Sequence, residues 1–113
     1  MGARALCGRG DDYRRGMSDE RIAALRLEID AINERLLELL SERQDVSVAI
    51  GAIKAEEGMP LYSHEREAQI LERFRRDAVE WNLDPDYVEE LMNVVLRNSR
   101  AAQRKNVAGD DDG

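Results

Sequence analysis

A long stripe of mainly apolar residues, spaced alternately by three and four positions, constrains the fold of this chain more than any other feature. This spacing returns to one face of an α-helix, and no proline interrupts it before Pro60. The pattern predicts one helix from Ser18, a suitable N-cap, to about Glu57, where Gly58-Met59-Pro60 ends it. The stripe consists of Ile22, Leu25, Ile29, Ile32, Leu36, Leu39, Arg43, Val46, Ile50 and Ile53.

The length of this helix has a consequence for assembly. About 38 residues at ~1.5 Å each make a rod of ~57 Å. A compact domain of ~100 residues has a radius of gyration of only ~13 Å. Two shorter helices cannot cover such a stripe along its whole length, but the long helix of a second copy can. We therefore expect an obligate, intertwined homodimer.

The rest of the chain predicts two shorter helices. The first runs from Ser63 or His64 to about Trp81, and the second begins with Asp84 as N-cap and Pro85 at its first position and ends near Val107. No segment reads as a strand, and aromatic residues make up only 4% of the chain, so the expected fold class is all-α with three helices per protomer. The residues expected to face inward are Leu71, Phe74, Ala78, Val88, Leu91, Met92, Val95 and Leu96.

Both ends of the chain differ in character from this helical body, which we place at residues 17–107. Residues 1–16 contain four glycines and four arginines without apolar periodicity. They are expected to form a disordered leader, or to result from a start codon upstream of a true start at Met17. Cys7, within them, is expected to be an incidental thiol. Residues 108–113 are expected to form a disordered acidic tail.

Composition excludes several classes of function. The net charge is −7 and no basic stripe is present, which argues against nucleic acid or an anionic membrane as partner. The longest apolar runs are far shorter than the ~20 residues of a membrane span. The single cysteine cannot form an internal disulfide, so we expect a cytoplasmic protein. One cysteine and one histidine do not suffice for a metal site of the usual kind.

Five polar residues lie where the helical pattern predicts an inner face: Arg43, Lys54, Glu67, Ser99 and Gln103. A buried charge without a partner is costly, so these groups need each other or a polar ligand. One interpretation is a structural network, with Arg43 paired to Glu67 and Ser99 bonded to the carbonyl four residues before it. The other is a pocket whose excess positive charge suits a small dianion, because carboxylates bind Arg and Lys donors.

Arg26 lies seventeen residues before Arg43, a separation that turns a helix by about −100°. It cannot point the same way as Arg43 from the same helix, but in an intertwined dimer it can reach the pocket of the partner. The alternative is a surface pair with Asp30, four residues later.

With these residues the chain resembles the all-helical AroQ class of chorismate mutases, type II, over residues 18–107. No single motif is specific, but five of them occur in the right order and at the right spacing. The matching motifs are L25-R26-x-E28-I29, L39-L40-x-E42-R43, I50-G51-x-x-K54, E65-R66-E67 and S99-x-x-x-Q103.

The resemblance implies an intertwined helical dimer that converts chorismate to prephenate on the route to phenylalanine and tyrosine. The reaction is a unimolecular rearrangement that needs no cofactor, metal or nucleophile. The enzyme holds the substrate in its reactive shape and stabilises charge as the ether C–O bond breaks.

The resemblance also implies residue roles. Arg43 and the partner's Arg26 clamp carboxylates, and Lys54 and Gln103 donate to the ether oxygen and a neighbouring carboxylate. Glu67 binds the ring hydroxyl.

The remaining roles concern the first turn of the second helix and its surroundings. Ser99 and Arg66 support the carboxylate side of the site. Ser63 stands where many relatives have Asp, and it acts through its backbone N–H or simply as an N-cap. His64 is expected to be a solvated residue at the helix start and not a catalyst.

Two other functions remain open. One is a lyase on the same fold that converts isochorismate to salicylate and pyruvate; Glu67, Ser99 and Gln103 favour the mutase. The other is a helical dimerisation module without activity, in which Arg43 only fixes the register of the long helices.

Overall fold

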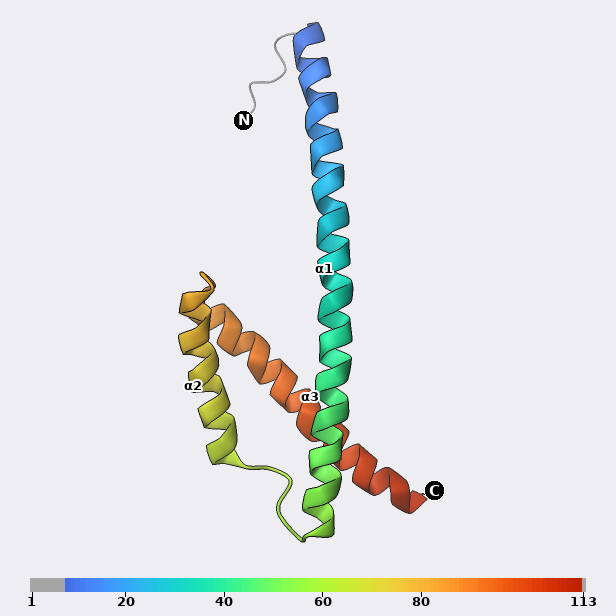
Figure 1. Cartoon of the computed structure of the whole chain (residues 1–113), viewed down its shortest axis with the longest axis vertical. Helices are drawn as coiled ribbons and strands as arrows, with labels where there is room; N and C mark the ends of the chain where they lie inside the picture. The colour runs from blue at the N-terminus through green and yellow to red at the C-terminus, as the bar shows by residue number, and fades with distance from the viewer. Residues whose placement is uncertain (1–7, 113) are drawn as a thin grey trace. The chain divides into compact units, whose positions relative to one another are not determined.

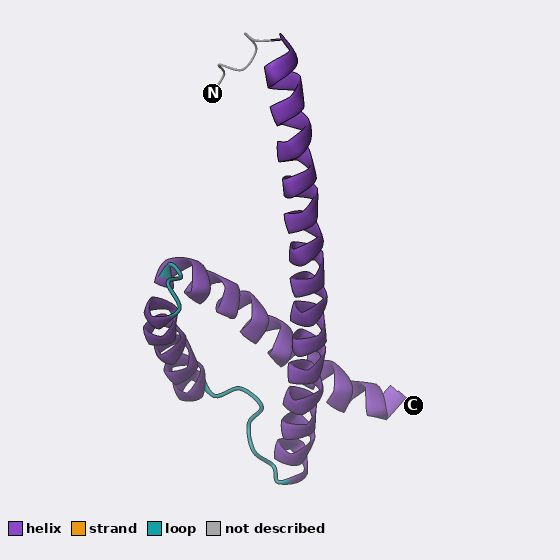
Figure 2. Ribbon diagram, turned by 45° about the horizontal axis from the view of Figure 1, so that its top comes forward, coloured by secondary structure: helices purple, strands orange, loops and turns teal. Residues whose placement is uncertain are grey.

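The computed structural model describes the backbone of residues 8–112 and the side chains of residues 14–109. These residues form three helices, α1 (Gly8–Glu56), α2 (His64–Glu80) and α3 (Pro85–Asp112), joined by turns and loops without a strand (Figures 1 and 2). The expected fold class, three helices of which one is long, is therefore confirmed. None of the described helices combines the length and the apolar character needed to cross a membrane.

The helix boundaries follow the capping signals closely, except at the two ends of the chain. α1 begins at Gly8, ten residues before the expected N-cap Ser18, and α3 extends to Asp112, beyond the expected end at Val107. These stretches carry no apolar periodicity, but a helix that has already nucleated extends by one hydrogen bond per residue. Residues 1–7 of the expected leader, Cys7 among them, and Gly113 of the expected tail lie outside the described residues.

The end of α1 is closed by a left-handed residue. Gly58 has φ 71°, its N–H donates to the carbonyl of Ala55 at 3.2 Å, and the N–H of Met59 donates to the carbonyl of Lys54 at 2.7 Å. This pair of bonds is a Schellman motif, which glycine accommodates without steric cost.

The end of α2 has the same geometry without a glycine. Asn82 has φ 59°, its N–H donates to Val79 at 3.2 Å, and the N–H of Leu83 donates to Ala78 at 2.8 Å. The next helix starts at once, because the Asp84 side chain accepts from the N–H of Asp86 at 2.9 Å. The sequence Asn82 to Pro85 therefore ends one helix and begins the next, as expected.

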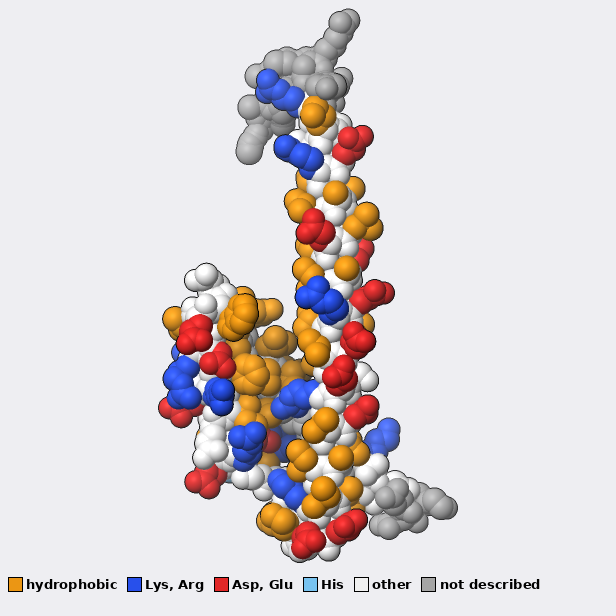
Figure 3. Space-filling view, in the orientation of Figure 1, with side chains coloured by type: hydrophobic (Ala, Val, Ile, Leu, Met, Phe, Trp, Pro, Cys, Tyr) orange, Lys and Arg blue, Asp and Glu red, His pale blue; other side chains and the backbone are white. Residues whose placement is uncertain are grey.

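The chain divides into two compact units, residues 1–40 and residues 41–113, and α1 contributes to both. In the N-terminal unit the apolar stripe of α1 is exposed; Leu25 is 58% and Leu36 is 51% exposed in this single chain. Figure 3 shows apolar side chains along this part of α1.

In the C-terminal unit, α2 and α3 pack around a small core of Ala78, Val88 and Met92, with Leu71 and Val95 against it. Leu96 of α3 is also buried. Two residues expected to face inward do not do so in the single chain, because Phe74 and Leu91 are 36% and 47% exposed.

Arg75 ties α2 to the start of α3 at the rim of this core. It donates to Asp86 Oδ1 at 3.0 Å and to Glu89 Oε1 at 2.6 Å. The hydrogen bonds that Arg75 donates, first to Asp86 and then to Glu89, raise the pKa of Arg75 above its ordinary value.

Candidate active site

Arg43 and Ser99 form the first polar link between α1 and α3. The half-buried Arg43 donates from Nη1 to Ser99 Oγ at 2.7 Å, and the buried Ser99 hydroxyl donates to the carbonyl of Val95 at 3.1 Å. Among residues 14–109, no carboxylate pairs with Arg43. Of the two contacts in the structural-network interpretation, the bond of Ser99 to the carbonyl four residues earlier is present, whereas Arg43 contacts Ser99 and not Glu67.

Gln103 and Ser47 form a second link, one turn further along both helices. Gln103 is 8% exposed, and its Nε2 lies 2.8 Å from the carbonyl oxygen and 3.1 Å from Oγ of Ser47. Gly51, the next residue on this face of α1, is buried against Gln103. Two buried polar residues of α3 therefore each form a hydrogen bond with a residue of α1.

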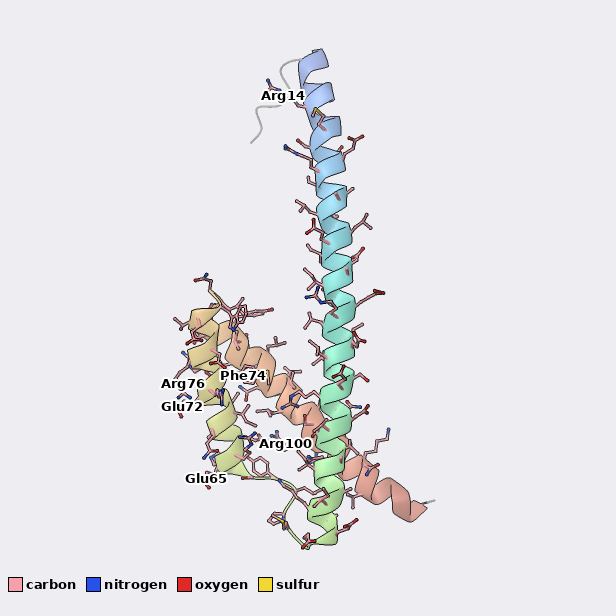
Figure 4. All side chains as sticks on the ribbon, in the orientation of Figure 1. Arg14, Glu65, Glu72, Phe74, Arg76 and Arg100 are labelled. Atoms are coloured by element: carbon pink, nitrogen blue, oxygen red, sulfur yellow. The ribbon has the colours of Figure 1, made fainter. Side chains whose placement is uncertain are left out.

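Glu67 also has a partner other than the one in the structural-network interpretation. It forms an ion pair with Arg100 of α3, and the two side chains are only 19% and 26% exposed. The Arg100 guanidinium also lies over the ring of Tyr62, with Cζ 5.1 Å from the centroid, a cation–π arrangement. In Figure 4 the labelled Arg100 lies on the side of α3 toward α2. Tyr62 Oη lies 3.1 Å from Nδ1 of His64, which is exposed as expected.

Lys54, Ser63 and Arg66 surround the connection between α1 and α2. The half-buried Lys54 donates from Nζ to the carbonyl of Leu61 at 3.5 Å, a long bond that leaves the ammonium with further donors. Ser63 caps α2, because its Oγ accepts from the N–H of Arg66 at 3.2 Å. The Arg66 side chain is exposed.

Three of the predicted site residues, Arg43, Arg66 and Glu67, line two clefts of the C-terminal unit. The first, of about 450 Å³, is lined by Arg43 and by one face of α2 that includes Arg66 and the exposed Phe74. Four of its lining residues are arginines and two are acidic, so its charge suits an anion. The second, of about 290 Å³, is lined by Glu67 and Arg100 among others. In the single chain, Arg43 and Glu67 therefore line different clefts.

Arg26 belongs to the N-terminal unit and is exposed. No hydrogen bond or ion pair links it to another of the described residues; in particular, the alternative pair with Asp30 is not formed. Nothing within residues 14–109 groups three or more His, Cys, Asp or Glu side chains as a metal site.

Three residues of this region were not among the predicted site residues: Ser47, Gly51, which appears only as part of the motif I50-G51-x-x-K54, and Arg100. Ser47 and Gly51 lie four and eight positions after Arg43, which places them on the same face of α1. That spacing was a usable signal. Arg100 directly follows Ser99 on an otherwise charged helix surface, and nothing in the sequence distinguishes it from Arg97 or Arg104.

Comparison with known proteins identifies the family. The model of the family described as chorismate mutase type II matches residues 25–104, which include every predicted site residue. A chorismate mutase of Methanocaldococcus jannaschii is 29% identical over 86 residues, which are 76% of this chain and 87% of that protein. The T-protein of Enterobacter agglomerans is 34% identical over 73% of this chain, and the bifunctional chorismate mutase/prephenate dehydratase of Escherichia coli K12 is 32% identical over 77%.

The chain spans only 22% of the length of each of these last two relatives, so it corresponds to one part of them. The family match, by contrast, covers well over half of this chain and contains the polar links of α1 with α3. This chain belongs to the chorismate mutase type II family.

Proposed function

We propose that this chain converts chorismate to prephenate, without a cofactor, as a homodimer with two shared active sites. The observation that carries the proposal is the half-buried Arg43, which is oriented by Ser99 and has no carboxylate partner among residues 14–109. Gln103, whose amide is buried, follows Ser99 by one turn of α3. An arginine held by a neutral hydroxyl keeps most of its five N–H donors for a ligand.

Arg43 and Lys54 supply the positive charge for a dianionic substrate. An arginine fork binds a carboxylate through two parallel N–H···O bonds, and this geometry fixes the orientation of the substrate as well as its affinity. Arg66 lines the same cleft as Arg43 and adds a cation at its edge. Restricting a flexible substrate to its reactive shape supplies much of the acceleration of a unimolecular rearrangement.

Gln103 and Lys54 act where charge develops. As the ether C–O bond breaks, negative charge accumulates on the oxygen, and fixed N–H donors stabilise it more than they stabilise the ground state. Both groups are held by main-chain carbonyls, Ser47 for Gln103 and Leu61 for Lys54, so they need little reorganisation during the reaction. Glu67 accepts from the ring hydroxyl, which requires that Arg100 share this carboxylate with the substrate.

A second copy of the chain completes the site. The exposed apolar stripe of the N-terminal unit is the surface that the long helix of a partner would cover, and Arg26 follows the stripe residue Leu25. We propose that Arg26 of each protomer enters the site of the other. Sedimentation should give twice the mass of the chain at all concentrations at which the protein stays folded, because an obligate dimer has no stable folded monomer.

The deciding experiment is to mix the purified protein with chorismate, follow its disappearance and identify the product. Prephenate supports the proposal. Salicylate and pyruvate formed from isochorismate, without prephenate from chorismate, would identify the lyase, and no turnover of either compound would identify a module without activity. Arg43→Ala should lower kcat/KM by ~10²-fold or more. Arg104→Ala, which removes an exposed arginine beside Gln103, serves as the matched control and should leave activity unchanged.

A further inference from the structure

The orientation of the Gln103 side-chain amide is set by Ser47. Nε2 of Gln103 lies 2.8 Å from the main-chain oxygen of Ser47. A carbonyl oxygen has no proton to donate, so the amide end that contacts it must be the NH₂ group. The χ3 torsion angle of glutamine has a broad, roughly two-fold distribution, so the side chain does not fix the orientation of its own amide. A contact with a neighbouring group is needed to select one orientation.

The Ser47 hydroxyl adds a second constraint. Its Oγ lies 3.1 Å from the same Nε2, and Ser47 is itself half-buried between α1 and α3. The two acceptors of one residue therefore engage the NH₂ group together. One turn further along the same face of α1, a Cβ at Gly51 would lie 2.8 Å from Cγ of Gln103, so the aliphatic part of the Gln103 side chain packs closely against α1.

We propose that Ser47 is a positioning residue for the reaction given under Proposed function, on which this inference rests. Its carbonyl determines which end of the Gln103 amide donates. Its hydroxyl accepts the second N–H in the empty site and releases it when the ether oxygen of the substrate takes its place. Ser47 itself does not contact the substrate; it acts by holding the donor in one orientation before the substrate arrives.

The test compares Ser47→Ala with Ser47→Thr, which keeps the hydroxyl. We expect Ser47→Ala to lower kcat by about three- to tenfold, the range that one net hydrogen bond represents, with a smaller change of KM. Ser47→Thr should retain most of the activity. Ser41→Ala is the matched control, because Ser41 is an exposed serine of the same helix, and it should change neither constant.

A double-variant cycle shows whether Ser47 acts through Gln103. In a Gln103→Ala background, Ser47→Ala should have no further effect on kcat, because the group that it orients is already gone. Two losses that multiply independently would overturn the proposal. These assays require that the parent protein turns over chorismate; if it does not, the proposed function fails. The contact of Ser47 with Gln103 is then tested by the amide-proton exchange measurement described below.

The pH profile of a Gln103→Glu variant gives a readout that a merely structural role of Ser47 would not move. The Ser47 hydroxyl can donate to a carboxylate at position 103 and so lower its pKa. Adding Ser47→Ala should raise that pKa, and the range of pH in which the protonated, donating form is active should extend upward. An unchanged profile would contradict the proposal.

A measurement independent of activity covers the case in which a variant folds poorly. In the ¹⁵N-labelled parent, the two side-chain amide protons of Gln103, assigned by their loss in Gln103→Glu, should exchange slowly with solvent. Exchange as fast as that of the exposed Gln69 would overturn the proposal.

Discussion

The substitution Gly51→Ala should change the free energy of unfolding only moderately but lower kcat strongly. Gly51 is buried in the interior of α1, and a Cβ there would lie 2.8 Å from Cγ, 3.0 Å from Cβ and 3.2 Å from Cδ of Gln103. These atoms belong mainly to the root of the side chain, which cannot swing away while the backbone of α3 stays in place. Either Gln103 changes rotamer or α3 moves by several tenths of an ångström.

The free energy of unfolding should change only moderately. Alanine is favoured over glycine in a helix interior by ~1 kcal/mol, whereas overpacking of this kind costs ~1–3 kcal/mol. The net result is a loss of about 0–2 kcal/mol. The effect on catalysis should be larger, because a displacement of ~1 Å of a positioned donor can cost ~10²-fold in rate.

The assay is chemical denaturation at a fixed protein concentration, combined with kcat for chorismate. The control is Gly16→Ala in the same helix, where a Cβ would meet nothing within 4 Å, and which should leave kcat unchanged. A Gly51→Ala enzyme with the parental kcat would refute the reasoning. It would mean that the close contact of Gly51 with Gln103 has no bearing on the reaction.

Four further predictions concern the shared site, the two donors at the ether oxygen and the end of α2. The Arg26→Ala and Arg43→Ala variants should each be nearly inactive alone but should regain activity when mixed and refolded together, because one site of each heterodimer is then intact. If heterodimers form but activity does not return, both arginines serve the site of the same protomer. The Gln103→Glu variant should have low activity at neutral pH and regain activity as the pH falls. Only the protonated carboxyl can donate a hydrogen bond, and the Ser47 carbonyl, which lies 2.8 Å from Nε2 of Gln103, disfavours the ionised form. Full activity at pH 8 would place residue 103 away from the ether oxygen. Lys54→Ala should not recover at any pH, because no donor remains at its position. Asn82→Gly should raise the free energy of unfolding by up to ~1 kcal/mol, because Asn82 has φ 59° and glycine adopts that conformation at less cost; a loss of stability in denaturant titrations would contradict this.

The sequence by itself determined the helices and most of their ends. The helix ends are set by local signals at Gly58, Ser63 and the Asp84-Pro85 pair, which cap or end a helix through bonds to their immediate neighbours. These ends can therefore be predicted without knowledge of the tertiary structure. The three- and four-residue spacing likewise identified Arg43, Ser99 and Gln103 as polar residues on inner faces, and two of these three are buried. The family motifs could be identified for the same reason, since they are fixed spacings along single helices.

Only the tertiary structure decided which polar groups pair. Whether Arg43 contacts Glu67 or Ser99 depends on the register and crossing of α1 and α3, and no local pattern encodes it. The pairing of Glu67 with Arg100 depends in the same way on how α2 packs against α3. The role of Gly51 has the same origin, because a missing side chain becomes significant only when another helix occupies its space. Spacing along a helix gives the face that a residue occupies, whereas its partner is set by packing between helices.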